Sequence, residues 1–163
     1  MKNHNLLAIL LIALSITFTP SIGRSDAPTP VSRLDALFPE DTRSILEHSQ
    51  KFTLYSIKRD DMNPNPTAEH LEQYYEVVKS RVLTRGKDRK RIIKALYAGI
   101  NDPEAASYNC FDPHHAIVAE RDGRKVVLLV CFECGSVEMS CGDLRGHAPT
   151  TSAPQPAFDA MLK

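Results

Sequence analysis

The 163-residue chain has no tryptophan and no net charge, because its 20 basic residues are balanced by 20 acidic ones. A neutral chain produces no general field that attracts nucleic acid or acidic lipid. Basic residues interleaved with aromatic ones, the pattern that stacks bases, are also missing. We therefore expect no nucleic-acid partner.

The sequence also lacks the short motifs that mark common catalytic sites. It contains no G-x-S-x-G nucleophile elbow, no phosphate-binding glycine loop and no H-E-x-x-H zinc motif. Since no other set of residues predicts a particular reaction, the sequence favours a protein that is not an enzyme.

Long hydrophobic runs are limited to the N-terminus, where residues 6–18 are uncharged and mostly apolar. This run is shorter than the roughly 20 residues that span a bilayer, and Pro20, Ser21 and Gly23 follow it. The pattern predicts a signal peptide that is cleaved after Gly23, with an uncleaved anchor as the alternative. We expect an exported protein, periplasmic or secreted, with no transmembrane segment after cleavage.

The rest of the chain has the length of one domain. Residues 1–23 are the predicted signal peptide, residues 24–38 a polar flexible leader, and residues 39–163 a single domain. The order of elements predicts an α+β fold, with a small antiparallel sheet, one main helix packed on one face and short terminal helices. The expected elements are a short helix after Pro39, helices at 88–100 and 157–162, strands at 52–57, 75–84, 116–119, 126–132 and 136–140, and a loop over 144–156.

The clearest local signal is Asp122-Gly123 between two apolar stretches, because Asp-Gly strongly favours a two-residue hairpin turn. The register of such a hairpin places His114 opposite Cys131 and brings Cys110 close to Cys134. We therefore expect these four side chains to gather at one end of the sheet.

All four cysteines of the chain lie in its last third. An even number of cysteines in an exported protein favours disulfide bonds. We expect two structural disulfides, Cys110–Cys134 and Cys131–Cys141, while the other two pairings stay open.

The same end of the hairpin supports two alternatives. Zinc or another transition metal takes mixed Cys and His ligands, and the candidate ligands are Cys110, His114, Cys131 and Cys134, with His115 and His147 as substitutes. Alternatively, Cys131 with His114 as its base forms the site of a thiol-dependent enzyme, or Cys131 and Cys134, as a Cys-x-x-Cys pair, form a redox dithiol.

The local geometry decides between these chemistries. A straight strand points Cys131 and Cys134 to opposite faces, whereas a turn at Gly135 brings them together. For the same reason the adjacent His114 and His115 point to opposite faces, and we expect one to be packed and the other solvated.

Eight basic residues lie within residues 79–94, where Asp88 is the only acidic residue. Part of this run falls at the start of the predicted main helix, where the helix dipole disfavours cations. The run indicates either an anionic partner or nearby carboxylates such as Glu69, Glu72 and Glu76. We expect the second, a solvated face that is paired internally.

Residues 110–117 read Cys-Phe-Asp-Pro-His-His-Ala-Ile, an Asp-Gly hairpin follows within 121–125, and residues 130–134 read Val-Cys-Phe-Glu-Cys. This order resembles a family of small exported bacterial proteins with the pattern Cys-Phe-x-Pro-x-His, an Asp-Gly hairpin and Cys-Phe-Glu-Cys. The resemblance implies export and a shared fold, and it implies no activity.

These observations together predict a non-enzymatic, exported, disulfide-stapled domain of the cell envelope. We expect it to bind a protein partner, as an inhibitor or immunity-type protein does, and to need no cofactor.

Overall fold

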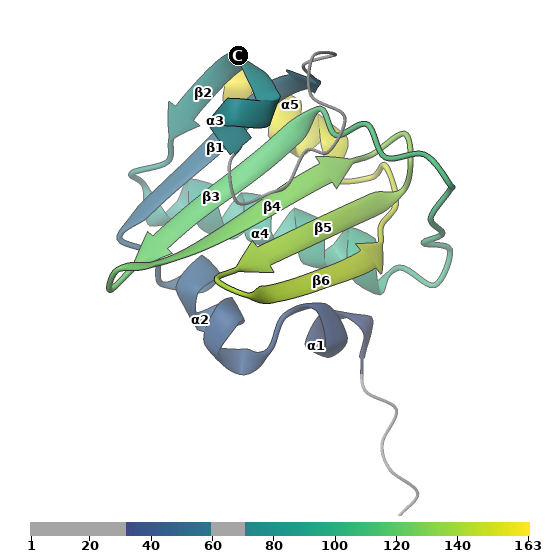
Figure 1. The fold of residues 1–163 in the computed structure, drawn as a ribbon, viewed down its shortest axis with the longest axis horizontal. Coiled ribbons are helices and arrows are strands. Elements are labelled where there is room, and N and C mark those ends of the chain that lie inside the picture. The colour runs from purple at the N-terminus through teal and green to yellow at the C-terminus, as the bar shows by residue number, and fades with distance from the viewer. Residues whose placement is uncertain (1–31, 60–70) are drawn as a thin grey trace, which may run out of the picture.

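The computed structural model describes residues 32–59 and 71–163, and its fold is α+β, as the sequence predicts. Six antiparallel strands form one open sheet in the order β2-β1-β3-β4-β5-β6 (Figure 1). In chain order the elements are α1 (Arg33–Leu37), α2 (Glu40–Glu47), β1 (Lys51–Arg59), α3 (Leu71–Tyr74), β2 (Tyr75–Val82), α4 (Gly86–Asn101), β3 (His115–Arg121), β4 (Arg124–Cys131), β5 (Ser136–Cys141), β6 (Leu144–Pro149) and α5 (Gln155–Leu162).

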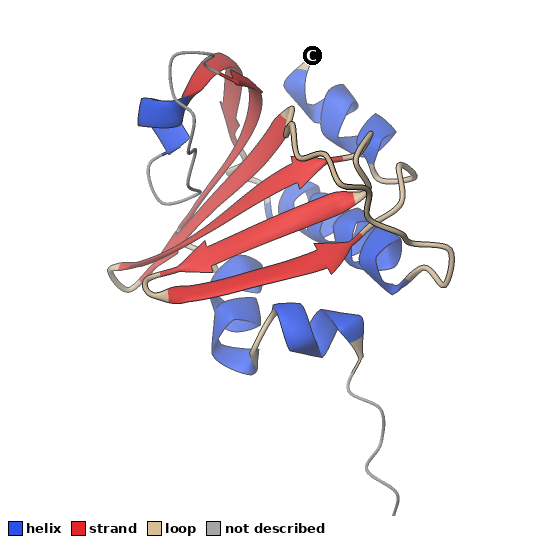
Figure 2. Ribbon diagram, turned by 45° about the vertical axis from the view of Figure 1, so that its right-hand side comes forward, coloured by secondary structure: helices blue, strands red, loops and turns tan. Residues whose placement is uncertain are grey.

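Different elements cover the two faces of the sheet. On one face, Ile117 and Leu128 belong to the main core together with Leu96 of α4. On the other face, Leu129 belongs to a smaller cluster with Leu71 of α3. Successive side chains alternate between faces, which is why the neighbours Leu128 and Leu129 enter different clusters. Figures 1 and 2 show α4 and α5 on the same side of the sheet.

Helix α4 is the main helix that the sequence predicts. Ile92, Leu96 and Ile100 recur at helical spacing, and each is at most 1% exposed. The helix ends at Asn101 because Asp102 lies directly before Pro103, and a residue before a proline disfavours helical geometry. The helices expected after Pro39 and near the C-terminus are α2 and α5. No helix in the described ranges is long and apolar enough to cross a membrane.

The predicted β3–β4 hairpin is present with the expected register. Ala119 lies opposite Val126, and the ladder ends with His115 opposite Val130. The next step of this register brings His114 to the level of Cys131. The sequence therefore placed both residues at the correct end of the sheet.

The expected loop over 144–156 is wrong in its first half, because Leu144–Pro149 forms strand β6 and pairs with β5. Cys141 lies opposite Leu144, so Gly142 and Asp143 form a two-residue turn. Gly142 has φ +56°, a left-handed conformation that glycine adopts without strain. Gly-Asp is itself a hairpin signal, and the Pro, Thr and Ser that follow it obscured the strand.

The flexible leader expected over 24–38 is also wrong at its C-terminal end. Helix α1 begins at Arg33, and the Ser32 hydroxyl accepts a hydrogen bond from the Asp35 amide as its N-cap. Leu37 and Phe38 are at most 1% exposed and belong to the main core. The predicted signal peptide and the rest of the leader, residues 1–31, lie outside the described residues.

Candidate functional site

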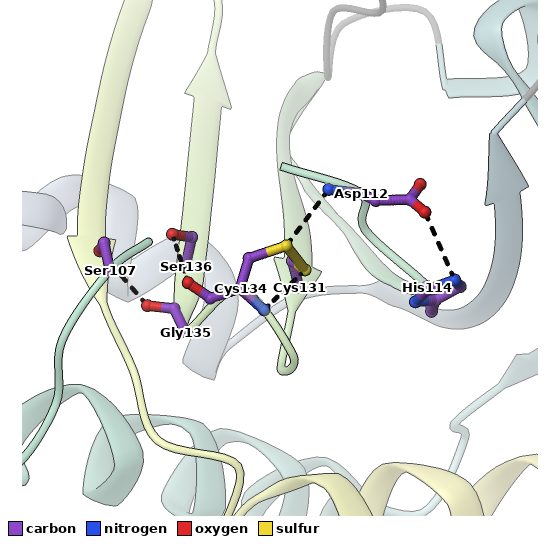
Figure 3. Close-up of a disulfide and its surroundings, with 7 residues drawn as sticks. All are labelled: Ser107, Asp112, His114, Cys131, Cys134, Gly135 and Ser136. Atoms are coloured by element: carbon purple, nitrogen blue, oxygen red, sulfur yellow. Dashed lines mark hydrogen bonds and ion pairs between the residues drawn. A yellow bond between two sulfur atoms is a disulfide. The ribbon is translucent and has the colours of Figure 1, made fainter. Parts of the chain in front are cut away.

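The four cysteines divide into one bonded pair and two free thiols. Cys131 and Cys134 form a disulfide, with their Cα atoms 5.2 Å apart (Figure 3). They converge because the chain leaves strand β4 and turns, and Gly135 adopts φ +60° at the end of that turn. Cys110 is a free, exposed thiol, and Cys141 is a free, half-buried one.

The expected connectivity, Cys110–Cys134 with Cys131–Cys141, is therefore wrong. Cys131 lies opposite Ser136 in the β4–β5 ladder. Cys141 is five residues further along β5, which at about 3.4 Å per residue is about 17 Å away. Cys141 also packs against the main core on the helix side of the sheet, so no strand adjustment brings it to Cys131.

The segment before β3 is attached to the cysteine turn, as the hairpin register predicts. The Tyr108 amide donates to the Cys134 carbonyl at 3.0 Å, and the Asp112 amide donates to Cys134 Sγ at 3.4 Å (Figure 3). Ser107 Oγ donates to the Gly135 carbonyl at 3.3 Å. Cys134 is only 3% exposed. The disulfide is thus a buried staple beneath this segment.

One of the two neighbouring histidines is packed and the other is solvated, as expected. The His115 side chain is 7% exposed, and its Nε2 lies 2.9 Å from Asp159 Oδ1 of α5. Its ring also contacts Phe132 and Phe158. Burial lowers the pKa of His115, although Asp159 opposes this effect. The His114 side chain is 46% exposed.

The structure does not bring the predicted metal ligands together. Within residues 32–59 and 71–163, no three His, Cys, Asp or Glu side chains lie close enough to hold a metal ion. Cys131 and Cys134 are bonded to each other and present no thiolate. His147 lies on β6 opposite Glu138, two strands away from Cys131.

In the part of the chain that the structure describes, the basic run over residues 79–94 forms only one ion pair. Arg85 Nε lies 2.6 Å from Asp88 Oδ2. Arg81 and Arg89 donate instead to backbone carbonyls. The other basic residues of the run form no ion pair with a described residue: Lys79, Lys87, Lys90, Arg91 and Lys94. Among the described residues the expected internal pairing is thus limited to Arg85. Glu69 lies outside those residues, and the side chain of Glu72 is not described either.

Four of these unpaired cations lie on the exposed side of α4, beside an apolar groove of about 500 Å³. We call this hollow the α4 groove. Its lining comes from the end of α2 and from α4: Glu47, Lys90, Ile93, Lys94, Tyr97, Ala98 and Asn101. Ile93 is buried in the main core, and Tyr97 is half-buried and packs against it. Their spacing marks both as inward-facing residues of the helix, so the sequence carried no signal for a groove beside them.

Tyr97 carries a polar atom that the sequence did not single out. Its hydroxyl is shielded from water and lies beside the Glu47 carboxylate. Burial raises the pKa of the Tyr97 hydroxyl, and Glu47 raises it further, both by its charge and as a hydrogen-bond acceptor. The group therefore stays protonated, and its acceptor belongs to the protein itself.

The fold and these surfaces define an α+β domain with a disulfide-closed turn at one end of its sheet and a cationic helix on one face. The chain matches no protein-family model, no curated protein and no solved structure. The resemblance to small exported bacterial proteins stays a prediction.

Proposed function

We propose that this protein is an exported, disulfide-stapled binding domain without enzymatic activity, and that its target is another protein of the cell envelope. The observation that carries the proposal is the α4 groove, where apolar side chains lie beside lysines that have no ion-pair partner among the described residues. An apolar centre with a polar rim is the usual anatomy of a protein interface.

The scaffold supports this role because it holds the groove rigidly. Helix α4 is anchored to the sheet by Ile92, Leu96 and Ile100, which are almost fully buried. A surface that is ordered before binding loses less conformational entropy when a partner arrives. The groove is therefore preorganised.

Export is supported by the N-terminal sequence and by the cysteine pair. The apolar run over residues 6–18 has the length of a signal-peptide core. Disulfides persist in oxidising compartments and are rare in the cytosol, and Cys131 and Cys134 form one.

Site-specific photo-crosslinking in living cells of the native host tests this function. A photoreactive amino acid at Asn101, an exposed residue at the C-terminal end of the groove, is expected to give one discrete covalent adduct with a protein in the envelope fraction. The matched control is Asp143, an exposed residue in the β5–β6 turn, which should give none. The absence of an adduct at position 101, or the same adduct at both positions, contradicts the proposal.

A further inference from the structure

The charges along α4 indicate what kind of partner fits the groove. Lys87, Lys90, Arg91 and Lys94 are exposed and recur over two helical turns, a length of about 10 Å. Asp88, the acidic residue among them, is already paired with Arg85. Glu47 is the only carboxylate in the groove lining. The surface is thus complementary to a negatively charged partner.

The apolar part of the groove runs parallel to these cations. Ile93 and Tyr97 are four residues apart and therefore lie one above the other on the same side of α4. Viewed down the axis of α4, Lys90 and Lys94 lie between the row formed by Ile93 and Tyr97 and the side of the helix that faces away from the core. A partner must accordingly present an apolar stripe flanked on one side by carboxylates.

We infer that the α4 groove binds an acidic amphipathic helix of the partner protein; the inference rests on the proposed function and names the chemistry of its target. Two helices, α2 and α4, line the groove, and an amphipathic helix commonly binds by laying its apolar face into such a hydrophobic groove. A short groove on one side of α4 is typical of a weak, reversible interaction, because permanent complexes bury much larger areas.

Fluorescence anisotropy with synthetic peptides and the full mature protein tests this inference. The probe is a peptide of about 16 residues, long enough to form a helix, with leucines on one face and glutamates elsewhere. Two comparison peptides are a scrambled version of the same composition and a version with lysine in place of glutamate. We expect binding of the first peptide alone, weakened by added salt.

Variants of the protein separate the contribution of the groove from that of net charge. The Lys90→Glu/Lys94→Glu variant should weaken binding at least about tenfold, because two attractive charges become repulsive. Lys58→Glu/Lys163→Glu makes the same change in net charge outside the groove and should leave affinity unchanged. Ala98→Arg adds positive charge but fills the groove, so it should also weaken binding. Ala98 is exposed on α4, and circular dichroism confirms that each variant is folded.

Three results would overturn the inference. They are equal binding of the scrambled peptide, equal loss in both double variants, or tighter binding to phosphatidylglycerol vesicles or to a DNA oligonucleotide than to the acidic helix. If the crosslink at Asn101 forms while no acidic peptide binds, the interaction role stands and the inferred partner chemistry fails. If neither is observed, both fail.

Discussion

At the scale of single residues, Gly135 joins the cysteine turn to two other segments of the chain. Its backbone lies in the left-handed region at φ +60°, and a Cβ atom added there would be 2.1 Å from the Ala106 carbonyl oxygen. Its own carbonyl accepts hydrogen bonds from Ser107 and Thr150. The turn therefore joins the segment before β3 to the segment after β6.

We expect Gly135→Ala to destabilise the fold more than Gly123→Ala. Both glycines have positive φ, but nothing lies within 4 Å of a Cβ at Gly123. Gly123→Ala should therefore cost only the roughly 1–2 kcal/mol of a left-handed alanine. Gly135→Ala should cost about 1–3 kcal/mol more, because backbone must move to admit the methyl group. Urea unfolding measures both, and equal midpoints would contradict the close contact.

His115 makes the stability of the fold depend on pH. Burial lowers its folded pKa below the ordinary histidine value of about 6.5, against the opposing effect of Asp159. As the pH falls below that value, the unfolded chain binds a proton that the folded protein resists, so stability decreases. Above about 6.5 both states are neutral at this position, and this contribution vanishes.

We therefore expect His115→Phe to lose less stability than the native protein between about pH 7.5 and about pH 5. The variant keeps an aromatic ring against Phe132 and Phe158 but does not titrate. His114→Phe, at the exposed neighbour, should retain most of the native pH dependence, because the charge of His114 makes the smallest contribution to the lowered pKa of His115. Urea unfolding at several pH values provides the measurement, and parallel curves for the native protein and His115→Phe would refute the assignment.

At the scale of elements, the two hairpins show which features of the fold can be predicted from a few neighbouring residues. Asp122-Gly123 predicted both the β3–β4 turn and its register, because a two-residue turn leaves one way to pair the flanking residues. Gly142-Asp143 carried the same kind of signal for β5 and β6, but the polar residues of β6 do not show apolar alternation. An edge strand packs on one neighbour only, so its sequence is less constrained.

The disulfide is an element-scale staple, because it closes a turn of only four residues. The loss of chain entropy expected for so short a loop corresponds to about 2 kcal/mol. Cys131→Ala/Cys134→Ala should cost about that much in urea unfolding, whereas Cys110→Ala should be nearly neutral because its thiol is free and exposed. Alkylation followed by intact-mass measurement should find two reactive thiols before reduction and four after it. Four before reduction would contradict the staple.

At the scale of the whole molecule, the main core depends on the N-terminal helix. Leu37 and Phe38 are buried with the side chains of the sheet and of α4. The sequence suggested a leader here because the stretch before it is polar and rich in proline. Helix α1 is also too short to show a clear periodicity.

A chain that begins at Ser32 is expected to be more stable than a chain that begins at Pro39. The shorter chain lacks Leu37 and Phe38, and removing a core side chain costs roughly 2–5 kcal/mol. Two such losses approach the whole stability of a typical domain, about 5–15 kcal/mol. Thermal unfolding followed by circular dichroism distinguishes the two, and equal melting temperatures would show that α1 does not belong to the core.

The sequence by itself determined the α+β class, the main helix, five of the six strands and the β3–β4 register, because these follow from periodicity and turn chemistry within short windows. It also placed Cys131, Cys134 and the segment around Cys110 at one end of the sheet. Only the tertiary structure decided which cysteines bond, since that depends on the turn over residues 132–135 and on the lengths of β4 and β5. Likewise, only the packing of α2 against α4 shows that the basic run borders an apolar groove, because the two helices are brought together by a core that local sequence does not specify.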